Sequence, residues 1–241
     1  MSEPLVSVVM ATHNRRRWLP MALVCFLRQT YLNCELLVID DGDDYVYDLM
    51  PGSDRVRYLL AKKGMTIGEK MNRAIGKHAR GDIITFLDDD DWMAEWRIED
   101  QVSAMQRYGS RMCGSDRMWF WDLCGRRTWK YNADPGRPPQ RWVNYVVGAS
   151  MMFERSVWEE RPFVESGPIF ADTEFVRYRP EPWLNHMWTG SYVAMIHPGN
   201  TSPKQLQGAE WQMKGDEDIA MGLIGADDAQ WFMNLREELW P

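Results

Sequence analysis

The sequence predicts an α/β fold, with a mostly parallel sheet covered by helices on both faces and an antiparallel extension in the second half. Two observations predict it. In the first hundred of the 241 residues, short runs rich in Val, Leu and Ile alternate with stretches of helical periodicity, the pattern of βαβ units. Beyond residue 110 turn residues separate shorter strand-like segments. We expect one domain over 1–241, because a chain of this length can bury a sizeable core.

The first half supplies the elements of the expected parallel sheet. Its apolar runs predict four strands, at 5–11, 35–40, 55–59 and 83–87. Apolar residues at helical spacing predict three helices, one from near Arg17, one over 67–78 and one over 93–107. Pro20 supports the first helix, because proline prefers the first turn.

The second half predicts smaller elements. They are a hairpin over 111–131 with its turn near Gly125, a loop at 134–139, strands at 143–153 and 191–196, and an amphipathic helix over 226–239. We divide the expected domain into three sections, at 1–107, 108–203 and 204–241, the last being a helical tail.

Composition narrows the class of protein. A net charge of −7 argues against a chain that coats nucleic acid through bulk electrostatics. No run approaches the ~18 apolar residues of a membrane span, and no secretory signal is visible at the start. The four cysteines form no C-x-x-C pair, so we interpret them as small buried thiols in a reducing compartment. We expect a cytoplasmic protein with no membrane partner.

Polar residues directly follow three of the expected strands. Thr12, His13 and Asn14 follow the first, residues 40–44 with four aspartates follow the second, and the aspartates at 88–91 follow the fourth. Ligands of open α/β sheets bind just outside the carboxyl ends of the strands. The pattern therefore predicts one crevice built by three loops.

The four consecutive aspartates at 88–91 predict a metal site. Mg²⁺ and Mn²⁺ prefer carboxylate oxygens and often share them with a substrate's phosphates. The alternative is an acidic loop that caps the next helix, but one aspartate would be enough for that. The chain contains no G-x-G, and residues 64–70 miss the P-loop spacing, so other nucleotide motifs do not compete.

Three segments, at 6–14, 35–44 and 67–92, resemble glycosyltransferase family 2 in their order and spacing. The resemblance implies an inverting enzyme with the Rossmann-like GT-A fold, a nucleotide-diphospho-sugar donor (UDP in our interpretation) and an Mn²⁺ or Mg²⁺ ion. The first section would then bind the nucleotide sugar, and section 108–203 would form the acceptor side. The residues implied at the nucleobase and ribose are Ala11, Thr12, His13, Asp41, Asp88 and Asp89.

The resemblance also implies residues for the diphosphate, the metal and the chemistry. Asp90 ends the D-x-D signature at 88–90 and would hold the metal, joined by His197 of the late HPGNTS segment. Lys70 and Asn72 are candidates for the diphosphate or sugar; for Lys70 a solvated helix face is the alternative. Segment 148–153 is similar to the family's acceptor-side strand. Asp172, in segment 169–177, is the expected catalytic base, with Glu174 as the alternative.

The sequence departs from the family pattern at two positions. His13 stands where the family usually has an aromatic residue, and Ala171 replaces the acid that usually precedes the base. Gln140-Arg141-Trp142 is not the spaced signature of processive synthases, so we expect a single transfer. The alternatives are a nucleotidyltransferase, for which the N-terminal Gly-rich basic loop is missing, and a non-catalytic nucleotide-sugar-binding module.

The acceptor hypothesis rests on local charge. Residues 107–141 hold eight arginines and lysines against three aspartates, a net charge of +5 inside a chain of −7, with aromatic residues between them. This composition is typical of surfaces that bind phosphate backbones and stack bases. Hydroxymethylated bases of phage-type DNA are therefore one candidate acceptor. The other interpretation is an ordinary hairpin whose aromatic rings pack in the core.

Overall fold

A computed structural model describes residues 3–166, 171–186 and 190–240. Its larger sheet has the strand order β3-β2-β1-β4-β10-β6-β11-β9. The first four are parallel and match the predicted strands within two residues: β1 (Val6–Thr12), β2 (Cys34–Asp40), β3 (Val56–Leu60) and β4 (Ile83–Phe86). All of β2 and β4 is buried, as the apolar runs predict for strands covered on both faces.

Helices cover both faces of this sheet, as predicted. The core on one face includes residues of α1 (Leu19–Leu27) and α3 (Arg97–Tyr108), and the core on the other includes residues of α2 (Ile67–Lys77), α4 (Arg155–Glu160) and α5 (Ala171–Arg177). Local signals set the helix ends. Pro20 lies in the first turn of α1, Thr66 and Glu69 form a capping box on α2, and α3 ends at Gly109 with φ 60°.

Two predicted boundaries were wrong. The helix expected from residue 93 begins at Arg97, because Trp92–Met93 form strand β5 and pair with β12. The strand expected over 143–153 is divided into β9 (Trp142–Val143), a 3-10 turn at Gly148–Ser150 and β10 (Met152–Glu154). Ser150 stabilises this break, because its hydroxyl donates to the carbonyl of Val147 and accepts from the amide of Ser115.

The second half of the chain contributes to both sheets. β6 (Met112–Gly114), β10, β11 (Trp183–Asn185) and β9 complete the larger sheet, with β10 antiparallel to β4. The smaller sheet has the order β13-β8-β7-β12-β5. The predicted hairpin with its turn at Gly125 is confirmed as β7 (Arg117–Asp122) and β8 (Arg127–Asn132), and the late strand as β12 (Tyr192–Ile196).

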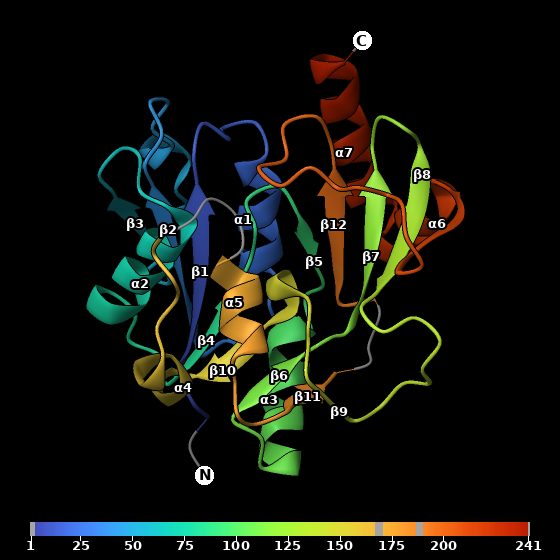
Figure 1. The fold of residues 1–241 in the computed structure, drawn as a ribbon. Helices are drawn as coiled ribbons and strands as arrows, with labels where there is room; N and C mark the ends of the chain where they lie inside the picture. Colours follow the sequence, from blue (N-terminus) through green and yellow to red (C-terminus); the bar gives the residue numbers. More distant parts are fainter. Residues whose placement is uncertain (1–2, 167–170, 187–189, 241) are drawn as a thin grey trace.

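The C-terminal section is not only helical. β13 (Trp211–Asp216) pairs with β8, with a register shift between Met213 and Gly215, before α6 (Asp218–Ile224) and α7 (Ala226–Leu239). The α7 helix has the predicted bounds. Figure 1 shows the smaller sheet beside the larger one, with α7 rising above the end of β12 toward the C-terminus.

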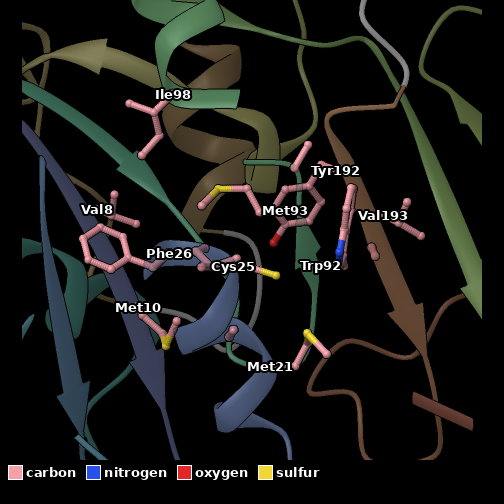
Figure 2. Packing of buried hydrophobic residues seen from close by; sticks show 14 of the residues in the cluster. Val8, Met10, Met21, Cys25, Phe26, Trp92, Met93, Ile98, Tyr192 and Val193 are labelled. Atoms are coloured by element: carbon pink, nitrogen blue, oxygen red, sulfur yellow. The ribbon is translucent and has the colours of Figure 1, made fainter. Parts of the chain in front are cut away.

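The hydrophobic core joins the two sheets. Figure 2 shows Phe26 of α1 beside Val8 of β1, and Trp92 and Met93 of β5 beside Tyr192 of β12. Three cysteines are buried, as predicted, but Cys124 is exposed because it lies in the β7–β8 turn. Among the helices that the structure describes, none has the length and apolar character that crossing a bilayer requires.

Candidate active site

Three polar loops meet at one edge of the larger sheet, because β2, β1 and β4 are neighbours and parallel. Asn14 connects the first two loops. It adopts φ 55°, and its side-chain oxygen accepts the amide hydrogens of Asp43 and Asp44 at 2.7 and 3.0 Å. Gly42 permits this approach, because a Cβ there would lie 2.7 Å from the Asn14 backbone nitrogen. The first two loops of the predicted crevice are therefore held together by hydrogen bonds within the fold.

Asp41 is the centre of one side of the crevice. Its carboxylate is 3% exposed and accepts from Lys70 Nζ at 2.8 Å and from His13 Nδ1 at 3.1 Å. Burial alone would raise the pKa of Asp41, but the bond to Lys70 and its charge, followed by His13, outweigh burial and lower that pKa. Lys70 is buried, so the alternative of a solvated helix face is wrong.

The other aspartates of the second loop organise the loop itself. Asp40 Oδ1 accepts from the amide of Gly42, and its Oδ2 accepts from the amide of Val46 and the hydroxyl of Tyr58. Asp43 and Asp44 are exposed and form ion pairs with Lys63 and Arg16. Of this cluster, Asp41 is the carboxylate that the loop holds beside Lys70.

Asp90 is the centre of the other side of the crevice. Its Oδ2 accepts from Arg15 Nη1 at 2.9 Å, from His197 Nε2 at 3.0 Å and from Asn200 Nδ2 at 3.4 Å. Burial would raise the pKa of Asp90, but the His197 bond and the Arg15 charge outweigh it and hold that pKa below its ordinary value. The structure thus brings the two residues expected to share a metal, Asp90 and His197, into direct contact.

Aromatic stacking fixes the ring of His197. The ring lies 4.0 Å from that of Trp18 with an interplanar angle of 18°, and 6.0 Å from that of Trp240 beyond the end of α7. The amide of Gly199 donates to His197 Nδ1 at 3.2 Å. Since Nδ1 accepts there, we assign the ring proton to Nε2, which faces Asp90.

The neighbouring aspartates differ from Asp90 in the direction in which the fold shifts their pKa values. Asp88 is partly exposed, but the loss of water around its carboxyl, followed by the charge of Asp90, raises its pKa to about 6. Burial and the charge of Asp90 also raise the pKa values of Asp89 and Asp91 well above the ordinary value. Asp91 Oδ1 accepts from the amide of Met195 and therefore connects this loop to β12. Four aspartates in sequence thus include one that is strongly held in its charged form.

Two buried oxygens in this loop region have no hydrogen-bond partner within the described residues. They are Thr12 Oγ1, on the last residue of β1, and Asp89 Oδ2. The hydroxyl of Thr12 lies near enough to the Asp89 carboxyl to lower its pKa. Unpaired buried oxygens are costly, so these atoms favour an additional polar group or cation at this position.

Asp172 lies at the start of α5, beside the crevice. Burial raises its pKa, and its charge raises the pKa of Asp88. Lys204 lies near enough to lower the pKa values of both carboxyls. Gly148 makes room for this side chain, because a Cβ there would overlap the Asp172 carboxylate. Ile169 and Phe170, the first residues of the predicted segment 169–177, lie outside the described residues.

Glu174, the alternative base, lies in a separate pocket of about 560 Å³ on the same helix. Tyr131 and Tyr145 supply aromatic rings there, and Arg177 supplies a positive charge opposite that of Glu174. The pocket therefore combines aromatic rings with one negative and one positive side chain, and Glu174 is two residues after Asp172 in the sequence.

The structure does not bring Asn72 to the crevice. Its side-chain oxygen accepts from Trp158 Nε1 and from the amide of Phe163, and its nitrogen donates to the Phe163 carbonyl and to Glu165. These bonds use the full capacity of the amide, and they hold the segment after α4 against α2. Ala11 is half-buried next to Thr12 in β1, so its backbone is what it can offer to a ligand.

The donor set suits a divalent ion that arrives with a phosphate ligand. Within the described residues, no group of three or more His, Cys, Asp and Glu side chains could hold an ion by itself. Asp90 and His197 supply a hard oxygen and an imidazole, and Asp89 adds an unpaired oxygen nearby. Mg²⁺ and Mn²⁺ commonly take one or two protein carboxylates and complete their shell with substrate phosphates and water. The residues fit that mode of binding.

The basic segment 107–141 does not form a continuous stacking surface. Arg111 pairs with three glutamates at 154, 160 and 181, far along the chain from the hairpin. Trp121 is fully buried, Phe120 is 4% exposed, and the Trp119 ring lies under Lys130. The rings thus mostly pack in the core, as the alternative interpretation of this segment expects.

Sequence reasoning missed Arg15, Trp18, Gly148 and Lys204 as residues of the site. Arg15 is the first of three consecutive arginines, and the sequence contains no signal that separates it from Arg16 and Arg17. The available clue was that Arg15 directly follows the polar residues at the end of the first strand. His197, the partner of Trp18, and Asp88, one of the two carboxyls near Lys204, are each more than 100 residues away in sequence, so spacing could not reveal these contacts.

Known proteins resemble this chain in sequence over part of its length and in fold over most of it. An uncharacterized glycosyltransferase of Haemophilus influenzae is 33% identical over 111 residues, which cover 44% of each protein. The Escherichia coli enzyme named UDP-Glc:alpha-D-GlcNAc-diphosphoundecaprenol beta-1,3-glucosyltransferase WfgD is 36% identical over 109 residues, 44% of this chain and 42% of that protein. The chain spans less than half the length of these relatives.

Two solved structures share the fold. One is S. aureus TarS 1-349 in complex with UDP, with a TM-score of 0.57, 17% identity, and coverage of 80% of this chain and 61% of that one. The other is the mannosyltransferase PcManGT from Pyrobaculum calidifontis with GDP-Man and Mn²⁺, with a TM-score of 0.58, 16% identity, and coverage of 85% and 59%. The fold is therefore that of the GT-A glycosyltransferases. The family model described as "Glycosyl transferase family 2" matches residues 7–161, and the chain belongs to this family.

Proposed function

We propose that this chain is a metal-dependent, inverting glycosyltransferase that moves one sugar from a uridine-diphosphate donor to an acceptor hydroxyl. The observation that carries the proposal is the shared crevice at the ends of β1, β2 and β4. It combines an ionised Asp41 beside Lys70, an Asp90–His197 pair, and Asp172 within electrostatic range of Asp88. Family membership and the nucleotide-bound neighbours support it.

The nucleotide would bind on the Asp41 side of the crevice. A carboxylate kept ionised by Lys70 is a strong acceptor for a base N–H. Thr12 and the backbone of Ala11 border the same loop, and the exposed ring of His13 can stack on the base. Lys70 is engaged with Asp41, so we assign it to orienting this acceptor. Asp88 and Asp89 follow β4, on the opposite border of β1, where a ribose would lie.

The chemistry requires a leaving diphosphate and an attacking hydroxyl on opposite faces of the anomeric carbon. A divalent ion at Asp90, with His197 beside it, would supply positive charge to the leaving phosphate when bound. Asp172 would take the proton of the acceptor hydroxyl, and its raised pKa improves that match. Gly148 keeps the space that its carboxylate occupies. The hydroxyl oxygen becomes the new glycosidic oxygen, and no enzyme nucleophile is needed.

The test is release of nucleoside diphosphate from a panel of nucleotide sugars, with Mn²⁺ and with excess EDTA. We expect slow Mn²⁺-dependent UDP release without acceptor, and faster release with a suitable one. Release of pyrophosphate from a nucleoside triphosphate would instead indicate the nucleotidyltransferase alternative. Tight donor binding without any release, across the panel, would indicate the non-catalytic module.

The pocket beside Asp172 favours one class of acceptor over another. The pocket of Tyr131, Tyr145, Glu174 and Arg177 favours a neutral sugar, because aromatic rings with few charges suit carbohydrate better than a polyanion. Hydroxymethylated DNA, the candidate from the sequence, draws less support because Phe120 and Trp121 are buried and the other hairpin rings are half-buried against the core. An acceptor panel should therefore include small glycans and duplex DNA with and without hydroxymethyl-pyrimidines, at several salt concentrations.

A further inference from the structure

One of three consecutive arginines reaches into the metal-binding side of the crevice. Arg15 Nη1 lies 2.9 Å from Asp90 Oδ2 and 3.3 Å from His197 Nε2, and Nη2 donates to the carbonyl of Gly199. Its side chain is 14% exposed. Arg17, by contrast, is 55% exposed and pairs with Glu238 on α7. The sequence places equal charges side by side, and the fold turns one of them inward.

The guanidinium uses the atoms that a divalent ion would need. Nη1 contacts both Asp90 Oδ2 and His197 Nε2, so an ion ligated by those two atoms would overlap it or face it at short range. The bond from the Gly199 amide to His197 Nδ1 also leaves the ring proton on Nε2, directed at Asp90. In this arrangement the Arg15 guanidinium already neutralises Asp90. A divalent ion at the same place would be repelled by the guanidinium, because both are positive.

We propose, on the basis of the function above, that Arg15 is a resident cation that excludes divalent ions from the Asp90–His197 pair until a nucleotide diphosphate binds. A diphosphate attracts both cations. A guanidinium forms paired hydrogen bonds with phosphate oxygens and has a long, flexible stem. When it turns from Asp90 to a phosphate, Oδ2 becomes available to the ion, and Nε2 does so once the ring proton has moved to Nδ1 in place of the bond from the Gly199 amide. Ion and donor then bind with positive coupling, which acts equally in both directions.

The coupling can be measured without any turnover, by Mn²⁺ binding from its electron paramagnetic resonance signal, with and without UDP. We expect the natural protein to bind Mn²⁺ weakly alone and at least tenfold more tightly with saturating UDP. Arg15→Gln should bind Mn²⁺ alone at least tenfold more tightly than the natural protein, and UDP should then add less than threefold. Arg17→Gln is the matched control and should behave as the natural protein does.

Arg15→Lys keeps the charge but not the paired geometry, and it should restore weak Mn²⁺ binding in the absence of UDP. Thermal melts without ion check that each variant is folded, and Arg15→Met, which also removes the charge, carries the test if the Gln variant is not. Equal Mn²⁺ affinity and equal UDP coupling in the natural protein and Arg15→Gln would overturn the role of Arg15 while leaving the metal-dependent function intact. Absence of Mn²⁺ binding in every variant, even with UDP, would overturn both.

Discussion

The two sides of the crevice differ in how their charges are balanced. On the Asp41 side, Asp41 has Lys70 and His13 within 3.1 Å, the buried Asp40 accepts two backbone amides and the Tyr58 hydroxyl, and one asparagine connects the loops. On the Asp90 side, three of four consecutive aspartates have raised pKa values, and Asp89 Oδ2 is a buried oxygen with no partner within the described residues. The first side is complete as folded, whereas the second carries a deficit of positive charge that a bound ion and substrate would relieve.

The difference teaches how one sheet edge can serve two tasks. A site that recognises a nucleobase gains from rigid, satisfied groups, because little ordering remains when the ligand binds. A site that stabilises developing charge gains from groups whose electrostatics are unfavourable until the reacting species is present. Substitutions on the Asp90 side should therefore alter turnover, and those on the Asp41 side should alter affinity and stability.

The largest expected effect is that of Asp90→Ala. It removes the one carboxylate that is strongly held in its ionised form on the reaction side, so Mn²⁺-dependent UDP release should fall by at least ~10³-fold. UDP release with and without EDTA measures it. The melting temperature checks the fold, because Arg15 and His197 lose their partner. Full activity in this variant would show that Asp90 has no role in the mechanism.

Asp172→Asn should have the next largest effect, lowering transfer by about 10²-fold while donor affinity changes little. The pH profile provides an independent check. Because the folded environment raises the pKa of Asp172, the natural enzyme should lose transfer as pH falls through that raised value, since the protonated carboxyl cannot accept the hydroxyl proton. Glu174→Gln is the matched comparison, with an expected change of a few-fold. The reverse ranking would exchange the two roles.

Gly148→Ala tests whether the position of the base matters as well as its presence. The added Cβ would overlap the Asp172 carboxylate, so the carboxylate must move, and we expect a roughly tenfold lower kcat with donor affinity unchanged. Gly52→Ala is the control, because a Cβ there has no neighbour within 4 Å. Unchanged kcat in Gly148→Ala would mean that Asp172 tolerates displacement.

Lys70→Met should have the smallest effect on turnover and a clear effect on stability. It leaves the carboxylate of Asp41 buried without its main partner, at a cost of about 3 kcal/mol in the free energy of unfolding, and should weaken UDP binding about fivefold. The lowered pKa of Asp41 means that the natural pair stabilises above the ordinary Asp pKa and is lost as pH falls through the folded value. Chemical denaturation at pH 7 and near pH 3 should therefore show the two proteins converging in acid.

Much of the first half could be predicted from the sequence, because local signals decide it. Fully apolar strands, a capping box at Thr66 and the αL glycine at 109 each act over a few residues. Placing Asp41, Asp90 and His197 at one crevice followed from the rule on strand ends and from family resemblance. The failures lay where long-range packing decides: Trp92–Met93 became a strand only because β12 lies beside it.

The site residues that escaped prediction share one cause. Nothing in Arg15, Arg16 and Arg17 distinguishes them until the chain folds, and only then does His197 meet the first of them. For Asn72 the sequence predicted a role at the site that the structure does not support. Its side chain instead forms four hydrogen bonds with Trp158 of α4 and with Phe163 and Glu165 after it. A motif names candidate residues, whereas the direction in which each side chain points depends on partners that are distant in sequence.

The register shift in β13 has a consequence for how the molecule behaves at high concentration. β13 is the outer strand of the smaller sheet, and an unpaired strand edge is a template on which another chain can add. The irregularity between Met213 and Gly215, together with the charge of Lys214, interrupts the row of hydrogen-bonding groups that such an addition needs. The last strand thus completes the sheet while discouraging growth into filaments, and a regular β13 without its lysine should promote self-association.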